Sequence, residues 1–111
     1  MVKTEIWVKA HLALCFSKGL TAVIANKGAP EAGAVYVQIT ISNHEVKVLA
    51  PAPGPAFDDH GNRTWSMPLG PDPVSPQQAS QYLARQRSFD RDIWIIDIDD
   101  RAGTGLLNLP E

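Results

Sequence analysis

The sequence lacks several features that would assign it to a functional class. One cysteine, Cys15, among 111 residues excludes an internal disulfide and a thiolate-rich zinc site. No apolar run approaches the roughly 20 residues of a membrane-spanning helix, and a net charge of −2 gives no general attraction to nucleic acid. Phosphate-loop, dinucleotide-binding, HExxH and nucleophile-elbow motifs are missing. We therefore expect no cofactor, no membrane partner and no nucleic-acid partner.

What remains is the composition of a small folded domain. Hydrophobic residues make up 44% of the chain and charged residues 20%, which is enough apolar material for a core and argues against disorder. The length predicts one domain over residues 1–111. The apolar N-terminal stretch is interrupted by Glu5, Lys9 and His11, so it does not have the unbroken core of a signal peptide. We expect a cytoplasmic protein.

The run from Ser75 to Asp100 carries the clearest structural signals. Ser75 and Gln78 have the spacing of a capping box, and Pro76 occupies the first helical position, where its missing N–H costs nothing. This predicts a helix over residues 76–89. After Asp90 the apolar residues alternate, which predicts a strand with one side chain in two on each face.

The N-terminal residues 4–18 predict a second helix, capped by Thr4 and ended by Gly19. Its apolar residues fall on two arcs, whereas a surface helix needs only one. Two arcs imply burial on two sides, either within the fold or against another subunit. The residues of the second arc, our candidates for a subunit interface, are Val8, Leu12, Cys15 and Phe16.

Alternating apolar residues predict further strands at 20–26, 33–42 and 45–50, with a short one at 63–67. Residues 51–62 and 68–74 are proline-rich and predict loops, and residues 104–111 form either an edge strand or a tail. Short links between strands favour antiparallel pairing. We predict an α+β domain: an antiparallel sheet of about four to five strands, with both helices on one face.

Several segments together resemble a known family. They are TEIWVKAHL, GLTAVIANKG and EAGAVYVQI, a proline-rich loop, and YLARQRSFDRDIWIIDIDD. Over residues 3–101 the chain resembles an alphaproteobacterial family of small cytoplasmic proteins, domain-of-unknown-function family 1491. The resemblance implies a single compact domain, with no assigned activity and no known catalytic residues.

The proline-rich loop contains Asp58, Asp59 and His60, which could bind a metal or perform acid–base chemistry. The alternative is that Asp-Asp-His-Gly-Asn simply forms a turn. Asp97 and Asp99 lie two apart on a predicted strand and could share a hard cation such as Mg²⁺, or could be solvated on an open face.

Arginines are the third group of candidates. Arg63, Arg85 and Arg87 could bind a phosphate or carboxylate through paired N–H donors. The alternative is an ion-pair network in which Asp90 and Asp92 neutralise the helix arginines.

Taken together, the residues favour a non-enzymatic protein-interaction or regulatory domain that forms a homo-oligomer or binds another protein. The alternative hypothesis is a small enzyme, or a metal- or anion-binding domain, built on the Asp58–His60 loop and the nearby arginines.

Overall fold

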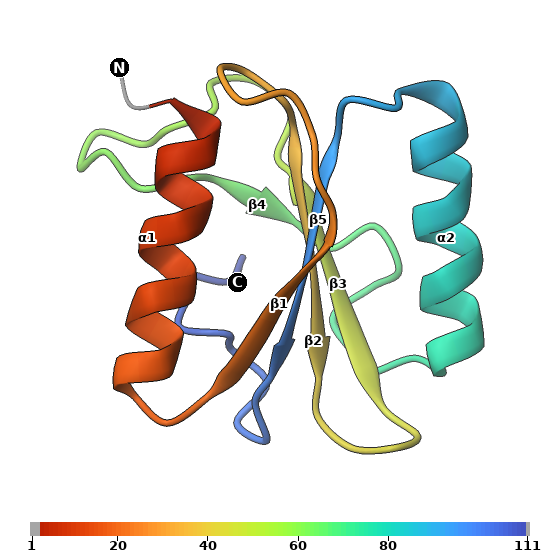
Figure 1. The fold of residues 1–111 in the computed structure, drawn as a ribbon. Coiled ribbons are helices and arrows are strands. Elements are labelled where there is room, and N and C mark those ends of the chain that lie inside the picture. The colour runs from red at the N-terminus through yellow and green to blue at the C-terminus, as the bar shows by residue number, and fades with distance from the viewer. Residues whose placement is uncertain (1–2, 111) are drawn as a thin grey trace.

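A computed structural model describes residues 3–110 of the chain. It contains two helices and five strands (Figure 1). In chain order they are α1 (Thr4–Ser17), β1 (Thr21–Asn26), β2 (Val35–Thr40), β3 (Val46–Pro51), β4 (Trp65–Ser66), α2 (Pro76–Phe89) and β5 (Trp94–Asp99). The predicted helices and strands are confirmed, apart from small shifts of their ends.

The five strands form one sheet in the order β1-β5-β2-β3-β4. Three of the four neighbouring pairs are antiparallel, as predicted, but β2 and β5 run parallel. The exception arises because β5 is reached only after α2, and such a long crossover connection allows parallel pairing where a tight turn does not. The sheet is therefore mixed and mostly antiparallel, and β5 lies between β1 and β2.

The two helices lie on opposite faces of the sheet, with α1 on one side and α2 on the other (Figure 1). Our prediction that both helices cover one face was wrong. The physical reason is that the interior strand β5 has apolar residues on both faces. Trp94, Ile96 and Ile98 face α1, while Ile95 and the preceding residue Ile93 face α2. A sheet that is apolar on both faces requires cover on both.

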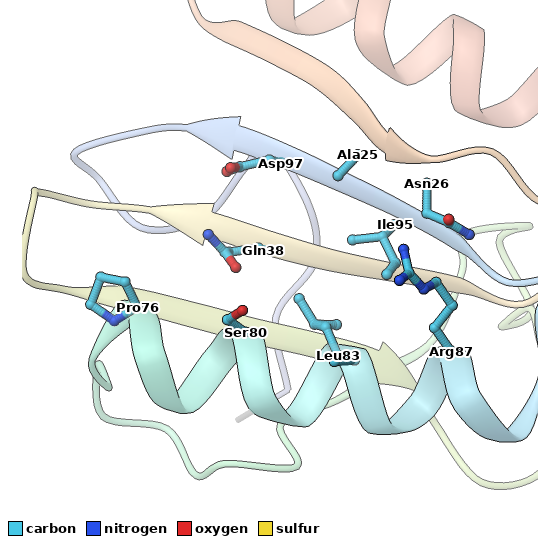
Figure 2. A pocket seen from close by; sticks show the side chains of 10 residues that line it. Ala25, Asn26, Gln38, Pro76, Ser80, Leu83, Arg87, Ile95 and Asp97 are labelled. Atoms are coloured by element: carbon cyan, nitrogen blue, oxygen red, sulfur yellow. The ribbon is translucent and has the colours of Figure 1, made fainter.

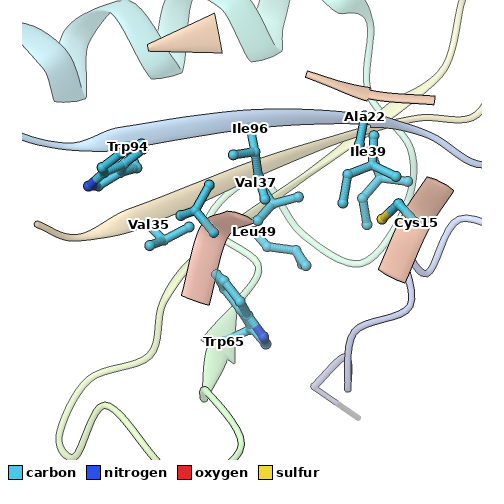
Figure 3. Packing of buried hydrophobic residues seen from close by; sticks show 11 residues of the cluster. Cys15, Ala22, Val35, Val37, Ile39, Leu49, Trp65, Trp94 and Ile96 are labelled. Atoms are coloured by element: carbon cyan, nitrogen blue, oxygen red, sulfur yellow. The ribbon is translucent and has the colours of Figure 1, made fainter. Parts of the chain in front are cut away.

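The larger part of the core lies between α1 and the sheet (Figure 3). Trp94, Ile96 and Ile98 are completely buried there, together with Val8 and Cys15 of α1. A smaller cluster lies under α2, where Ala79 and Leu83 pack on the opposite side of the sheet. The core is thus divided by the sheet into two layers.

The helix ends follow the sequence signals with one correction. The capping box of α2 is confirmed, because the Ser75 hydroxyl accepts from the backbone N–H of Gln78 and the Gln78 side chain accepts from that of Ser75. Gly19 follows α1 with φ +79°, as its role of helix stop requires. Thr4, however, is not the cap: Lys3 occupies that position without a side-chain cap bond, and Thr4 is buried inside the first turn.

The link between β1 and β2 holds the start of β5. The Trp94 indole N–H donates to the Ala29 carbonyl at 2.7 Å, and the Asn26 side chain donates to the Ile93 carbonyl at 2.8 Å. After β5 the chain makes turns rather than a strand, so within the described residues the segment from Thr104 onward is a tail. Leu107 and Leu109 of this tail pack on the core below α1.

Candidate functional site

The loop with Asp58, Asp59 and His60 is organised as a turn. One Asp58 carboxylate oxygen accepts from the backbone N–H groups of His60 and Asn62, each at 2.9 Å, which is typical turn chemistry. Asp59 and His60 are exposed to solvent. Within residues 3–110 no three His, Cys, Asp or Glu side chains converge on a point that could hold a metal ion. The loop therefore offers no assembled metal or acid–base site.

The two strand carboxylates differ in environment. Asp97 is partly buried on the α2 face and accepts from the Thr40 hydroxyl at 2.9 Å, whereas Asp99 is exposed near the end of β5. Burial raises the pKa of Asp97; the Thr40 hydrogen bond opposes this effect, and the charge of Asp99 reinforces it.

The three arginines are not brought together. Arg63 lies near Trp7 of α1, while Arg85 and Arg87 belong to α2 on the opposite face of the sheet. The predicted ion-pair network is also wrong: Asp90 instead accepts from the backbone N–H of Asp92 at 2.9 Å. Ion pairs among residues 3–110 are Lys3–Glu31, Lys9–Glu5 and Lys27–Glu5. The charges of Arg63, Arg85 and Arg87 are thus not neutralised by a described carboxylate at ion-pair distance.

A groove of about 450 Å³ runs between α2 and the sheet. Figure 2 shows Arg87 reaching from α2 toward Asn26 and Ile95, while Asp97 and Gln38 line the other end. The groove exists because α2 packs mainly over β3 and leaves part of β1 and β5 uncovered on this face. The sequence indicated Arg87 and Asp97 as separate candidates but not that they share one groove.

The interface candidates on α1 separate into buried and exposed residues. Val8 and Cys15 are 0% exposed within a single chain, so their assignment to a subunit interface was wrong: they contact the sheet of their own domain. Leu12 is partly buried against the same core, and Phe16 is 60% exposed. Burial raises the pKa of the Cys15 thiol, with the charge of Asp100 adding to the effect, so its reactive thiolate is disfavoured.

Two of the exposed large apolar side chains lie on the edge strand β1, and the others are spread over α1, α2 and the tail. Val23 is 52% exposed and Ile24 37%, and they point to opposite faces because successive strand residues alternate. Phe16 lies on the same side of α1 as Glu5, eleven residues earlier, and Glu5 pairs with Lys27 just beyond β1. We call the free edge of β1 with Phe16, Val23 and Ile24 the edge surface.

The most important polar residue that the sequence did not indicate is Asp100. Its carboxylate accepts from the backbone N–H groups of Ala102, Thr104 and Gly105 and from the Thr104 hydroxyl. Burial disfavours the charged form, but the four hydrogen bonds outweigh it and lower the pKa of Asp100. The available signal was Asp followed by Arg-Ala-Gly-Thr-Gly, a composition typical of a tight turn.

Comparison with known proteins agrees with this description. A family model described as "Protein of unknown function (DUF1491)" matches residues 2–108. A crystal structure of a DUF1491 family protein from Caulobacter crescentus is 26% identical, with a TM-score of 0.80 over 99% of this chain and 100% of that one. A solution structure of an A. tumefaciens protein is 29% identical, with a TM-score of 0.81 over 99% and 95% of the two chains. No match was found among curated proteins.

A membrane-spanning role finds no support in the helices. Neither α1 nor α2, the helices of the described part of the chain, has the length and apolar character needed to cross a bilayer.

Proposed function

The chain belongs to the DUF1491 family, whose function is unknown, and we propose that it is a protein-interaction domain that self-associates through the edge surface. The observation that carries this proposal is the exposed edge strand β1. Its residues, TAVIAN, include no charge and no proline, and Val23 and Ile24 are both exposed. Native edge strands are usually protected by charges, prolines or a covering element, because their free N–H and C=O groups pair readily with another strand.

A second copy of the same chain is the partner that fits this edge. Two β1 strands that meet antiparallel across a two-fold axis present the same surface to each other, as a symmetric dimer requires. Because β1 carries no charge, no like charges face each other within the paired strands. Val23 and Ile24 would then gain cross-strand neighbours from the second copy, which would cover part of their exposed area.

The register has a structural limit. The pairing of β1 with β5 shifts between Ile24 and Asn26, which is the mark of a β-bulge, and a bulge bends the strand away from regular pairing. We therefore assign the contact to the regular segment Thr21–Ile24. Such a short pairing gives a modest affinity, so the dimer forms in a concentration-dependent manner.

The test is the molar mass in solution, measured by sedimentation equilibrium across a range of concentrations. We expect the mass to rise from 12.1 kDa toward twice that value. Val23→Lys places a charge at the centre of the edge and should hold the protein at the monomer mass. Gln81→Lys introduces the same charge at an exposed site of α2 and serves as the matched control, which should associate like the unmodified protein.

Two results would contradict this function. One is a monomer mass at all concentrations up to about 1 mM, where even a weak dimer of millimolar Kd is populated. The other is association that Val23→Lys leaves unchanged, since the contact would then lie elsewhere on the molecule.

We also propose that the domain is cytoplasmic. A single buried cysteine without a disulfide partner supports a reducing compartment. The alternative function, a metal or acid–base site in the Asp58–His60 loop, has no supporting geometry in residues 3–110. Of the arginines considered for anion binding, Arg63 lies between aromatic side chains in a cavity of its own, apart from this loop.

A further inference from the structure

A cavity of about 280 Å³ lies on the α1 side of the molecule, at the end of the sheet opposite β1. It is formed where α1, the segment before β4 and the C-terminal tail meet. Its polar and aromatic lining residues are Trp7, His11, Asn62, Arg63, Trp65 and Asn108, and leucines supply most of the remainder. Among its lining residues in the part of the chain that the structure describes, Arg63 is the one permanent cation and none carries a carboxylate.

Arg63 is the unusual residue of this cavity. Its Nε is buried without a hydrogen-bond partner, the only such side-chain atom found in residues 3–110. Burial lowers the pKa of Arg63, although a guanidinium remains charged at neutral pH. A buried donor atom without an acceptor is costly, and structures rarely keep one without a use or a ligand.

Two aromatic rings lie close to the Arg63 guanidinium. Its central carbon lies 4.7 Å from the centre of the Trp7 ring and 5.1 Å from that of Phe57. Stacking on rings engages the flat face of a guanidinium and leaves its N–H donors directed outward in the plane. These donors form the fork that matches both oxygens of a carboxylate.

The tail is bonded to the α1 side of the cavity. The Trp7 and His11 rings are nearly parallel, with their centroids 5.2 Å apart. His11 Nε2 donates a hydrogen bond to the Gly105 carbonyl oxygen at 2.8 Å. The next residue, Leu106, has φ +59°, a conformation that no other non-glycine residue adopts among residues 3–110. Such strained positions persist where the surroundings determine them and often border functional sites. The cavity is thus pre-formed, which reduces the entropy lost on binding.

We propose that this cavity binds a small carboxylate that carries a flat apolar group. The carboxylate pairs with Arg63, and the apolar group lies between Trp7, Trp65 and the tail leucines. A phosphate dianion fits less well, because the single cation of the lining neutralises only part of its charge. This site is independent of the edge surface, since Arg63 lies beside β4 and β1 is at the other end of the sheet.

Sodium benzoate is a suitable probe, followed by ¹⁵N NMR at constant ionic strength. The indole N–H signals of Trp7 and Trp65 should shift and saturate. Trp94 is an internal control in the same spectrum, because its indole is fully buried and bonded to Ala29. Benzamide has nearly the same shape without the charge, and it should give no saturable shift at the same concentrations.

Variants identify the cation. Arg63→Gln should weaken benzoate binding roughly tenfold to a hundredfold, the value expected for losing a charge-assisted pair. Arg63→Lys keeps the charge but not the paired N–H donors, so its affinity for benzoate should lie between those of the original protein and Arg63→Gln. Arg87→Gln makes the same charge change on the opposite face of the sheet, and should alter the affinity by less than about twofold because distant surface charges are screened by salt. The Trp94 signal reports whether each variant is folded.

Several outcomes would overturn the proposal even if the Arg63 variants failed to fold. These are the absence of a saturable shift of Trp7 and Trp65 with benzoate, equal binding of benzoate and benzamide, and tighter binding of inorganic phosphate at the same signals. Val23→Lys, which tests self-association, should leave benzoate binding unchanged, so the two proposals can fail separately.

Discussion

Strands β1 and β5 are neighbours and both are rich in apolar residues, but they differ in how far these residues are exposed. Ile24 and Ile96 face each other across the pair; Ile96 is 0% exposed and Ile24 37%. β5 is paired on both edges, covered by α1 on one face and partly covered by α2 on the other, whereas β1 is paired on one edge only among residues 3–110. The difference shows that position in the sheet, rather than composition, decides whether an apolar strand forms core or surface.

The contrast also explains where a function can be sought. The apolar residues of β5 are buried within the fold, so they have no exposed area for a partner to cover. Those of β1 retain exposed area and free backbone groups, which a second strand can cover. Four predictions test this division between structural and available residues, beginning with the largest effect.

Truncation of the paired isoleucines should have unequal costs. Ile96→Ala opens a cavity in the centre of the core and should reduce the free energy of unfolding by about 2–5 kcal/mol. Ile24→Ala removes a partly exposed side chain and should cost about 1 kcal/mol or less. Urea unfolding of both variants at a low concentration, where the monomer dominates, measures the difference. Equal losses would show that β1 belongs to the core as fully as β5.

Gly28 tests how tightly the link after β1 approaches β5. A Cβ at this position would lie 2.6 Å from the Ile93 carbonyl carbon and nearer still to the Asp92 carbonyl oxygen. The backbone must shift to accommodate it, so Gly28→Ala should cost about 1–3 kcal/mol. A thermal unfolding midpoint equal to that of the original protein would contradict this close approach.

Asp100 should make the protein sensitive to acid. Its folded-state pKa is lowered, so its stabilising contribution is complete above the unfolded pKa of about 3.9 and is lost as the pH falls through the folded value. Asp100→Asn should lower the free energy of unfolding at pH 7 by about 1–2 kcal/mol. It should also make the free energy of unfolding fall less steeply as the pH is lowered. Unfolding measured from pH 7 to pH 2 provides the test; an unchanged acid limb would exclude Asp100 as its source.

Asp97 should show the opposite sign with the smallest effect. Its folded-state pKa is raised, so the folded state favours the protonated form, and the carboxylate opposes folding at neutral pH. Asp97→Asn should therefore raise the stability slightly at pH 7, and this gain should disappear as the pH falls from the folded pKa toward about 3.9. A loss of stability at pH 7 would mean that the Asp97 charge has a partner on the α2 face.

Much of the fold could be predicted from local signals. The capping box at Ser75 and the alternation around Trp94 placed α2 and β5, because both depend on neighbours in the sequence. The parallel pairing of β2 with β5 and the placement of α2 on the second face depend on contacts between distant segments, which periodicity does not encode.

The candidate sites were less predictable for the same reason. The sequence identified Arg63 as a possible anion-binding residue. It did not show that Trp7 and Phe57 lie beside the guanidinium, or that the tail lines the same cavity. The assignment of Val8 and Cys15 to an interface was wrong because two apolar arcs on a helix do not reveal which one faces the sheet. The turn at Asp58 and the buried Asp100 show that similar residues acquire opposite environments.

Amide hydrogen exchange at two protein concentrations tests the central claim about β1 most directly. The amides of β5 serve as the reference, since they are paired within one chain and should be protected at both concentrations. We predict that alternate amides in Thr21–Ile24, those directed away from β5, exchange freely in dilute protein and become protected in concentrated protein. Equal, rapid exchange of these amides at both concentrations would contradict the account of β1 as a self-association edge.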